Sequence, residues 1–158
     1  MKRFIYVFSV FLFAVTLVNA GVRDILDQHI IPRYERLHLE AMDLNRQAQK
    51  DCRTINLLKP YHKVFDAWVR ISHLRFGPVE ENGNSLAIAF WPDKKGFVKK
   101  VLRNLIADSD KVIESVDEFQ EISVAGRGLF ALELLLYDKD FAGYGLGDYE
   151  CGLVTAIT

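Results

Sequence analysis

The sequence predicts an all-α protein built as a helical bundle. Four stretches of its 158 residues carry apolar side chains at three- and four-residue steps, the period of an amphipathic helix. No stretch alternates convincingly between apolar and polar residues, as a half-buried strand would. With 50% hydrophobic residues, the chain is long enough for one domain with a core and too short for two ordinary domains. One helical domain is therefore expected.

The first pattern runs from Gly21 to about residue 54, and Pro32 lies inside it. Because proline lacks a backbone N–H and crowds the preceding turn, we expect a short first segment and a longer helix from about Pro32 to Arg53. A second helix is expected from about Pro60, since proline suits a first helical turn, to Arg75. Gly77 and Pro78 follow and end it.

The second half of the chain carries the other two helices. The segment 85–92 is apolar but too short to classify, and we expect an irregular packed loop. Residues 96–107 place apolar side chains on one stripe and basic ones opposite, which predicts a third helix. A polar stretch, 111–120, leads into the most apolar helix, expected over 123–137. A further apolar pattern over 149–158 ends without a cap, so we expect the helical domain 21–158 to be incomplete at its C-terminus.

The N-terminus has the organisation of a secretory signal peptide. A basic start, Met1–Arg3, precedes an apolar run from Phe4 to Val18 and a small-residue cleavage site at Ala20. An uncleaved anchor is the alternative, but the run is shorter than the ~20 residues that span a bilayer. We therefore expect residues 1–20 to be removed and the mature chain to have no stable membrane span.

Export determines how the two cysteines, Cys52 and Cys151, are interpreted. An oxidising compartment favours a disulfide between them, and two free thiols are the alternative.

The 20 basic and 21 acidic residues give a net charge of −1. Nucleic-acid-binding domains usually carry a basic excess, so the composition argues against a nucleic-acid partner.

Two sets of polar side chains are candidates for chemistry. His62, Asp66 and His73 share one side of the second expected helix and are weak candidates for metal ligands. That side lies nearly opposite the apolar stripe, so an ordinary solvated face is the favoured interpretation. The other candidate is Glu133, the single charge in an apolar helix, which we expect to be buried.

A buried carboxylate must be paired, hydrogen-bonded, metal-bound or protonated. Glu133 is therefore either part of a ligand or acid–base site, or a structural partner. In the structural alternative it forms a salt bridge to an arginine or accepts a hydrogen bond from an indole N–H. The candidate partners are Arg75, Arg127, Trp68 and Trp91.

Four sequence blocks carry a family resemblance, and their order and spacing are more specific than any block alone. They are Asp66-Ala67-Trp68, Arg75-Phe76-Gly77-Pro78, Phe90-Trp91-Pro92-Asp93-Lys94-Lys95-Gly96 and Gly128-Leu129-Phe130-Ala131-Leu132-Glu133. With them the chain resembles the imelysin-like family of exported bacterial proteins over about residues 22–158. The resemblance implies an all-α fold of two helical bundles, of which this chain is the N-terminal half. It also implies periplasmic or outer-membrane placement and an association with iron uptake.

The family was named for a peptidase and is associated with a G-x-H-x-x-E motif, whose histidine and glutamate would share one helix face and could hold a metal. The matching positions here are Gly128, Phe130 and Glu133, so phenylalanine replaces the histidine. Phenylalanine can neither ligate a metal nor relay a proton. This replacement weakens the peptidase interpretation.

The favoured hypothesis is therefore a non-catalytic, periplasmic binding protein linked to iron acquisition. The expected binding residues are Arg75, Trp91, Gly128 and Glu133. Its partner would be a ligand or an envelope protein, and iron or zinc is the cofactor to consider. A metal-dependent peptidase is the alternative enzyme, and a non-functional fragment of a longer protein is the third hypothesis.

Overall fold

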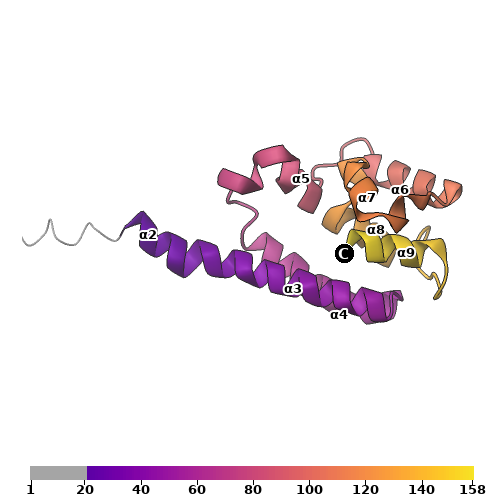
Figure 1. Cartoon of the computed structure of the whole chain (residues 1–158), viewed down its shortest axis with the longest axis horizontal. Helices are drawn as coiled ribbons and strands as arrows, with labels where there is room; N and C mark the ends of the chain where they lie inside the picture. The colour runs from indigo at the N-terminus through magenta and orange to yellow at the C-terminus, as the bar shows by residue number, and fades with distance from the viewer. Residues whose placement is uncertain (1–20) are drawn as a thin grey trace, which may run out of the picture.

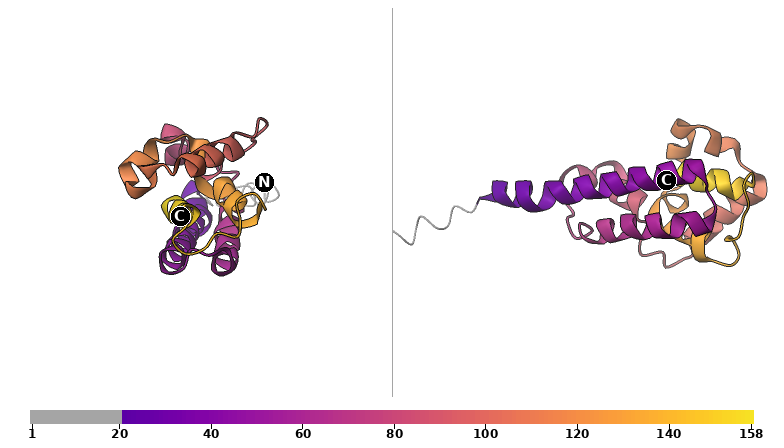
Figure 2. Two further views of the ribbon diagram at one scale, coloured as in Figure 1. Left: turned by 90° about the vertical axis from the view of Figure 1, so that its right-hand side faces the viewer. Right: turned by 90° about the horizontal axis from the view of Figure 1, so that it is seen from below.

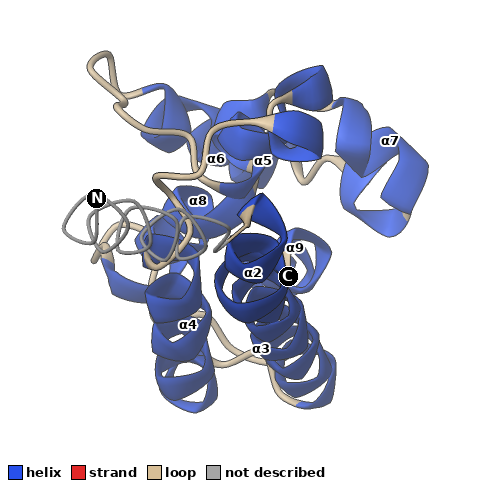
Figure 3. Cartoon of the chain, turned by 90° about the vertical axis from the view of Figure 1, so that its left-hand side faces the viewer, coloured by secondary structure: helices blue, strands red, loops and turns tan. Residues whose placement is uncertain are grey.

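The computed structural model describes residues 21–158, in which helices are joined by loops and no strand occurs (Figure 3). The expected signal peptide, residues 1–20, lies outside the described residues. The α-helices are α2 (Val22–Ile25), α3 (Ile31–Lys50), α4 (Thr54–Val69), α5 (Asn84–Ile88), α6 (Phe97–Asp108), α7 (Val116–Glu121), α8 (Gly128–Tyr137) and α9 (Tyr149–Ile157). The predicted all-α class is confirmed.

The helices pack in three levels (Figure 1). Helices α3 and α4 form a long hairpin, seen side by side in the right-hand view of Figure 2. Helices α8 and α9 lie on this hairpin, α8 against α4 and α9 against α3. Helix α6 packs on the other side of α8. Within residues 21–158, no helix has both the length and the apolar composition needed to cross a bilayer.

The longer helix expected from about Pro32 is confirmed as α3, but the expected break before it is not found, because the chain stays helical from α2 into α3. A π-helical turn, η1 (Leu26–Ile30), joins them, and Pro32 occupies the first turn of α3. The wider π turn changes the backbone hydrogen-bond register just where proline has no N–H to donate. The result is one long helix instead of two segments.

The expected bounds of the second helix are also wrong. Helix α4 begins at Thr54 and ends at Val69, so Pro60 lies inside it and residues 70–75 form turns. The hairpin connection is only three residues long, and its Arg53 side chain binds the Asp51 carboxylate. The chain has therefore already reversed by Thr54, and burial of the apolar face of α4 outweighs the hydrogen bond lost at Pro60.

The second half of the chain follows the expectations more closely. The third predicted helix is confirmed as α6. The segment predicted as an irregular loop forms the short helix α5 before becoming irregular. The polar stretch contains α7, whose first turn is capped by the Ser115 hydroxyl accepting from the Glu118 N–H. Helix α8 begins at Gly128, five residues later than expected, because a 3₁₀ turn (Val124–Gly126) and an extended Arg127 precede it.

Helix α8 is the centre of the core, which explains why it is apolar on almost every side. It contacts α4, α6 and α9, so little of its circumference meets water. Leucines from these helices are almost fully buried around it. The largest fully buried side chains are Leu57, Leu102, Leu132, Leu135, Leu153, Val154 and Cys52.

The expected disulfide is confirmed. Cys52 and Cys151 are bonded, with their Cα atoms 5.3 Å apart. The bond joins the three-residue connection between α3 and α4 to the first turn of α9, across 99 residues of sequence. The alternative of two free thiols is therefore wrong.

Replacing both cysteines, Cys52→Ala with Cys151→Ala, should lower the free energy of unfolding by about 2–5 kcal/mol, because the bridge restricts a long loop in the unfolded chain. Urea unfolding measures the difference. Reductant should bring the wild type close to the double variant and leave the double variant unchanged. Equal stability of the oxidised wild type and the double variant would contradict this prediction.

Candidate functional site

Two hollows lie along α4 and α8 and contain most of the predicted site residues. The first, which we call the aromatic pocket, has a volume of about 310 Å³. The second, which we call the acidic pocket, has a volume of about 360 Å³. The aromatic pocket is lined by Tyr34, Trp68, Ile71, Ser72, Leu74, Arg75, Val79, Glu80, Ser85, Leu86, Ile88, Ala89, Trp91 and Phe130. The acidic pocket is lined by Tyr61, His62, Phe65, Asp66, Glu133 and Tyr137.

Aromatic rings from α4 and α8 form the wall between the two pockets. The Phe130 ring meets Trp68 edge-on, with ring centres 6.0 Å apart and planes at 88°. It meets Phe65 in the same way at 6.1 Å. Since Phe65 lines the acidic pocket and Trp68 the aromatic pocket, these contacts separate the two hollows with apolar surface.

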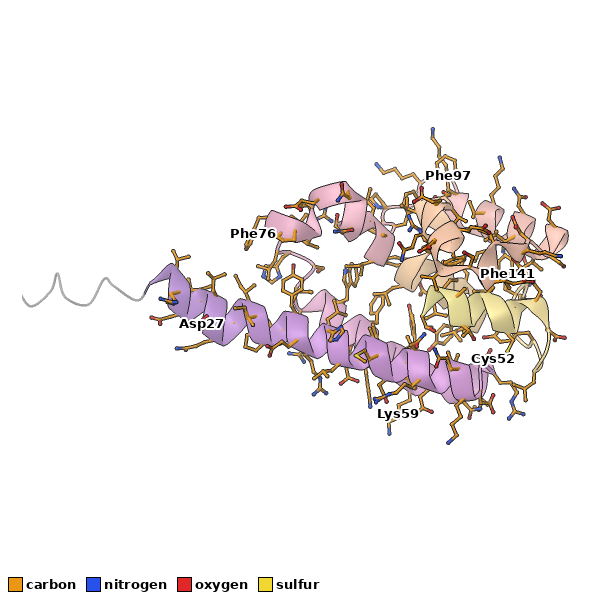
Figure 4. The ribbon with its side chains drawn as sticks, viewed as in Figure 1. Asp27, Cys52, Lys59, Phe76, Phe97 and Phe141 are labelled. Atoms are coloured by element: carbon orange, nitrogen blue, oxygen red, sulfur yellow. A yellow bond between two sulfur atoms is a disulfide. The ribbon has the colours of Figure 1, made fainter. Side chains whose placement is uncertain are left out.

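The aromatic pocket brings together two of the predicted binding residues, Arg75 and Trp91. Arg75 lies in the turns that follow α4, and Trp91 follows α5. Both are exposed, and the Trp91 side chain keeps 63% of its surface. The neighbouring Phe76 lies at the end of α4 opposite Cys52 (Figure 4), so this pocket is remote from the disulfide.

The expected burial of Glu133 is wrong. The residue is only half-buried and opens into the acidic pocket. Helix α8 is covered by α6 and α9 on its other sides, whereas the side bearing Glu133 faces the exposed edge of α4 that carries His62 and Asp66. Access to water there removes the need for a charged partner.

The partners proposed for Glu133 are not found either. Among residues 21–158, no ion pair to Glu133 forms within 4.0 Å, and no indole N–H donates to it. Arg75 lines the aromatic pocket on the other side of Phe130, and Arg127 lines a groove beside α3. Glu133 is therefore a carboxylate available in its pocket.

The three weak metal candidates are only partly brought together. His62 and Asp66 line the acidic pocket, whereas His73 lies in the turns beyond the end of α4. The Nε2 atom of His62 lies 2.6 Å from the Tyr137 hydroxyl and is hydrogen-bonded to it. Within the described part of the chain, no three histidine, cysteine or carboxylate side chains are placed to hold one metal ion. These residues do not fit a three-ligand iron or zinc site.

Tyr61 is one of three members of the acidic pocket, with Phe65 and Tyr137, that the sequence did not single out. Its periodicity assigns it to the apolar face of α4, and it is indeed buried, with its hydroxyl donating to the Leu129 carbonyl oxygen at 3.2 Å. Burial raises the pKa of Tyr61, and the nearby charge of Glu133 raises this pKa further. Glu80 and Tyr34 in the aromatic pocket were likewise not singled out, because each belongs to an ordinary loop or helix pattern.

Gly128, predicted as a binding residue, has a structural role in the fold. It begins α8 with a φ of +74°, a conformation that favours glycine. A Cβ atom here would fall against the carbonyl oxygens of Ala87 and Ile88 in α5. Glycine thus allows the backbones of α5 and α8 to approach closely.

Comparison with known proteins agrees with this fold. The sequence model of the imelysin family, peptidase M75, matches residues 30–158. The fold is similar to the crystal structure of an imelysin-like protein from Psychrobacter arcticum 273-4, with a TM-score of 0.74 and 23% sequence identity. That alignment covers 84% of this chain and 42% of the other, so the chain spans about two fifths of the length of that protein. No curated protein is similar enough in sequence to match.

Gly128→Ala should destabilise the fold more than Gly143→Ala, a matched control. Gly143 also has a positive φ, of +98°, but a Cβ there would meet nothing within 4 Å. The control should lose about 1–2 kcal/mol from backbone strain alone, whereas the Gly128 variant adds a backbone clash. Urea unfolding of both variants measures the difference. Equal losses of unfolding free energy in the two variants would mean that the close approach of α5 adds nothing to the effect of Gly128→Ala.

The raised pKa of Tyr61 predicts an alkaline loss of stability. Above pH about 10 the unfolded tyrosine ionises while folded Tyr61 keeps its proton, so the free energy of unfolding falls as the pH rises. The fall should be shallower in Tyr61→Phe. It should be slightly shallower in Glu133→Gln, because burial is the larger cause of the shift. Urea unfolding across this pH range tests both variants, and a slope unchanged in Tyr61→Phe would contradict the assignment.

Proposed function

Since this chain belongs to the imelysin family, we propose that it is an exported periplasmic member that acts as a non-catalytic binding protein in iron acquisition. The observation that carries the non-catalytic part is Phe130. It occupies the position that matches the motif histidine, and its ring packs edge-on against Trp68 and Phe65. An apolar ring in an aromatic cluster offers no lone pair to a metal and no proton to a substrate.

Two features support export, one in the sequence and one in the fold. The basic and apolar pattern of residues 1–20 is typical of a signal peptide. The Cys52–Cys151 bond is compatible with an oxidising compartment, where disulfides form and persist. The link to iron acquisition rests on the family resemblance alone.

The binding role is supported by the two pockets. Arg75 and Trp91 would contact a ligand in the aromatic pocket, and Glu133 would contact one in the acidic pocket. Gly128 would contribute indirectly by holding α5 against α8. Loops and helix ends supply most of the aromatic pocket, as in many binding sites carried on a rigid scaffold.

A metal-dependent peptidase is the second candidate, because His62, Asp66 and Glu133 line one pocket. Catalytic zinc sites in most enzymes need three protein ligands around one ion. These side chains are not placed to hold an ion in that way. The peptidase hypothesis therefore requires a rearrangement of α4 against α8.

The mass and metal content of the protein purified from the periplasm test the proposal. We expect a chain that starts at Gly21, because residues 1–20 are removed, and that is about 2 Da lighter before reduction, because two thiol hydrogens are absent. A full-length product held in the cytoplasm would contradict export. For catalysis, casein hydrolysis should be absent with added zinc. Hydrolysis that is lost with chelator and in Glu133→Gln would contradict the non-catalytic role.

A further inference from the structure

We propose that the aromatic pocket binds a free α-amino acid with an aromatic or large aliphatic side chain. The proposal deepens the binding role argued above by naming the ligand class. It does not depend on export, on iron or on the absence of catalysis. It rests on two unpaired opposite charges in one hollow whose walls are otherwise mostly apolar.

The two charges are those of Arg75 and Glu80. Both line the pocket, from the turns and the short 3₁₀ segments between α4 and α5. Within residues 21–158, neither takes part in an ion pair or a side-chain hydrogen bond, with each other or with a third residue. A cation and an anion are thus presented to the same volume without neutralising one another.

The rest of the lining is suited to an apolar body. Trp68 and Phe130 form one wall through their edge-on contact, and Trp91 stands exposed beside them. Aromatic rings bury apolar ligand surface, and their faces also attract an ammonium group. The volume of about 310 Å³ is at the lower end of the range for small-molecule sites, which suits a ligand of the size of a single amino acid.

An amino acid matches this arrangement group by group. Its carboxylate suits the guanidinium of Arg75, which can donate two parallel hydrogen bonds to it. Its ammonium suits the carboxylate of Glu80, and its side chain suits the rings. A ligand with a single charge could neutralise only one of these two residues. The other residue would lose contact with water without gaining a partner, which would weaken binding.

Tyr34 lines the same pocket as Glu80. It extends from α3 into the same lining, and burial raises its pKa, with the charge of Glu80 raising that pKa further. The lining that carries Glu80 thus also offers a phenol hydroxyl, which can donate a hydrogen bond to a polar ligand group.

The test is calorimetric titration of the mature protein with three probes that share one apolar body. L-Phenylalanine carries both charges, phenethylamine only the ammonium and 3-phenylpropionate only the carboxylate. We expect L-phenylalanine to bind at least about tenfold more tightly than either, since each of the other probes lacks one charge-assisted contact. Equal binding of all three probes, or no binding of L-phenylalanine, overturns the proposal.

Matched variants assign the charges. Arg75→Gln should remove the preference for L-phenylalanine over phenethylamine. Glu80→Gln should remove the preference for L-phenylalanine over 3-phenylpropionate. Arg70→Gln and Glu81→Gln are the controls, because both residues are exposed in the same region and neither lines the pocket. Circular dichroism shows whether each variant is folded. Preferences that move equally in the control variants would overturn the assignment. Failure of this test leaves the results on export, metal and peptidase activity unaffected, so the two proposals fail separately.

Discussion

Burial of α8 is the constraint on which the rest of the structure depends. This ten-residue helix carries one charge and is covered by α4, α6 and α9, so the three levels of the fold meet along it. Each fully buried leucine contributes roughly 1.5–3 kcal/mol relative to an exposed one. The one side that stays partly open is the side that bears Glu133, and the adjacent Phe130 closes the core toward the aromatic pocket. Stability and both candidate sites therefore share one helix.

Gly128 shows how a residue can shape a pocket without lining it. Because it has no side chain, the carbonyl oxygens that end α5 come close to the first turn of α8. Residues of α5, among them Leu86 and Ile88, form part of the aromatic pocket, and Phe130 of α8 forms another part. The close approach therefore sets the distance between two walls. The glycine of the sequence motif thus shapes the pocket without lining it.

Sequence periodicity predicted the elements whose burial follows one simple stripe and misplaced those that depend on neighbours. Helix α6 has one apolar face and was predicted to within a residue at each end. Pro32 was expected to begin a helix and does lie in the first turn of α3, but a π turn keeps the chain helical before it. Pro60 was also expected to begin a helix, but the packing of α4 places it inside one. Burial of Glu133 was inferred from α8 alone, whereas it depends on which part of α4 lies opposite. Glu80 could not be recognised because its place in the aromatic pocket, together with Tyr34 of α3, depends on how the loop folds.

The disulfide closes a loop that contains almost all of the sequence after the α3–α4 turn. This matters for molecules that a protease has cut. The exposed segment around Glu81 and Asn82 lies between Cys52 and Cys151 in sequence. A single cut there by a protease would yield two polypeptides that stay joined through sulfur. The fragment ending at the cut keeps α3 and α4, and the other keeps α6, α8 and α9. A nicked molecule would thus retain all partners of its core on one covalent unit and would separate into pieces only after reduction.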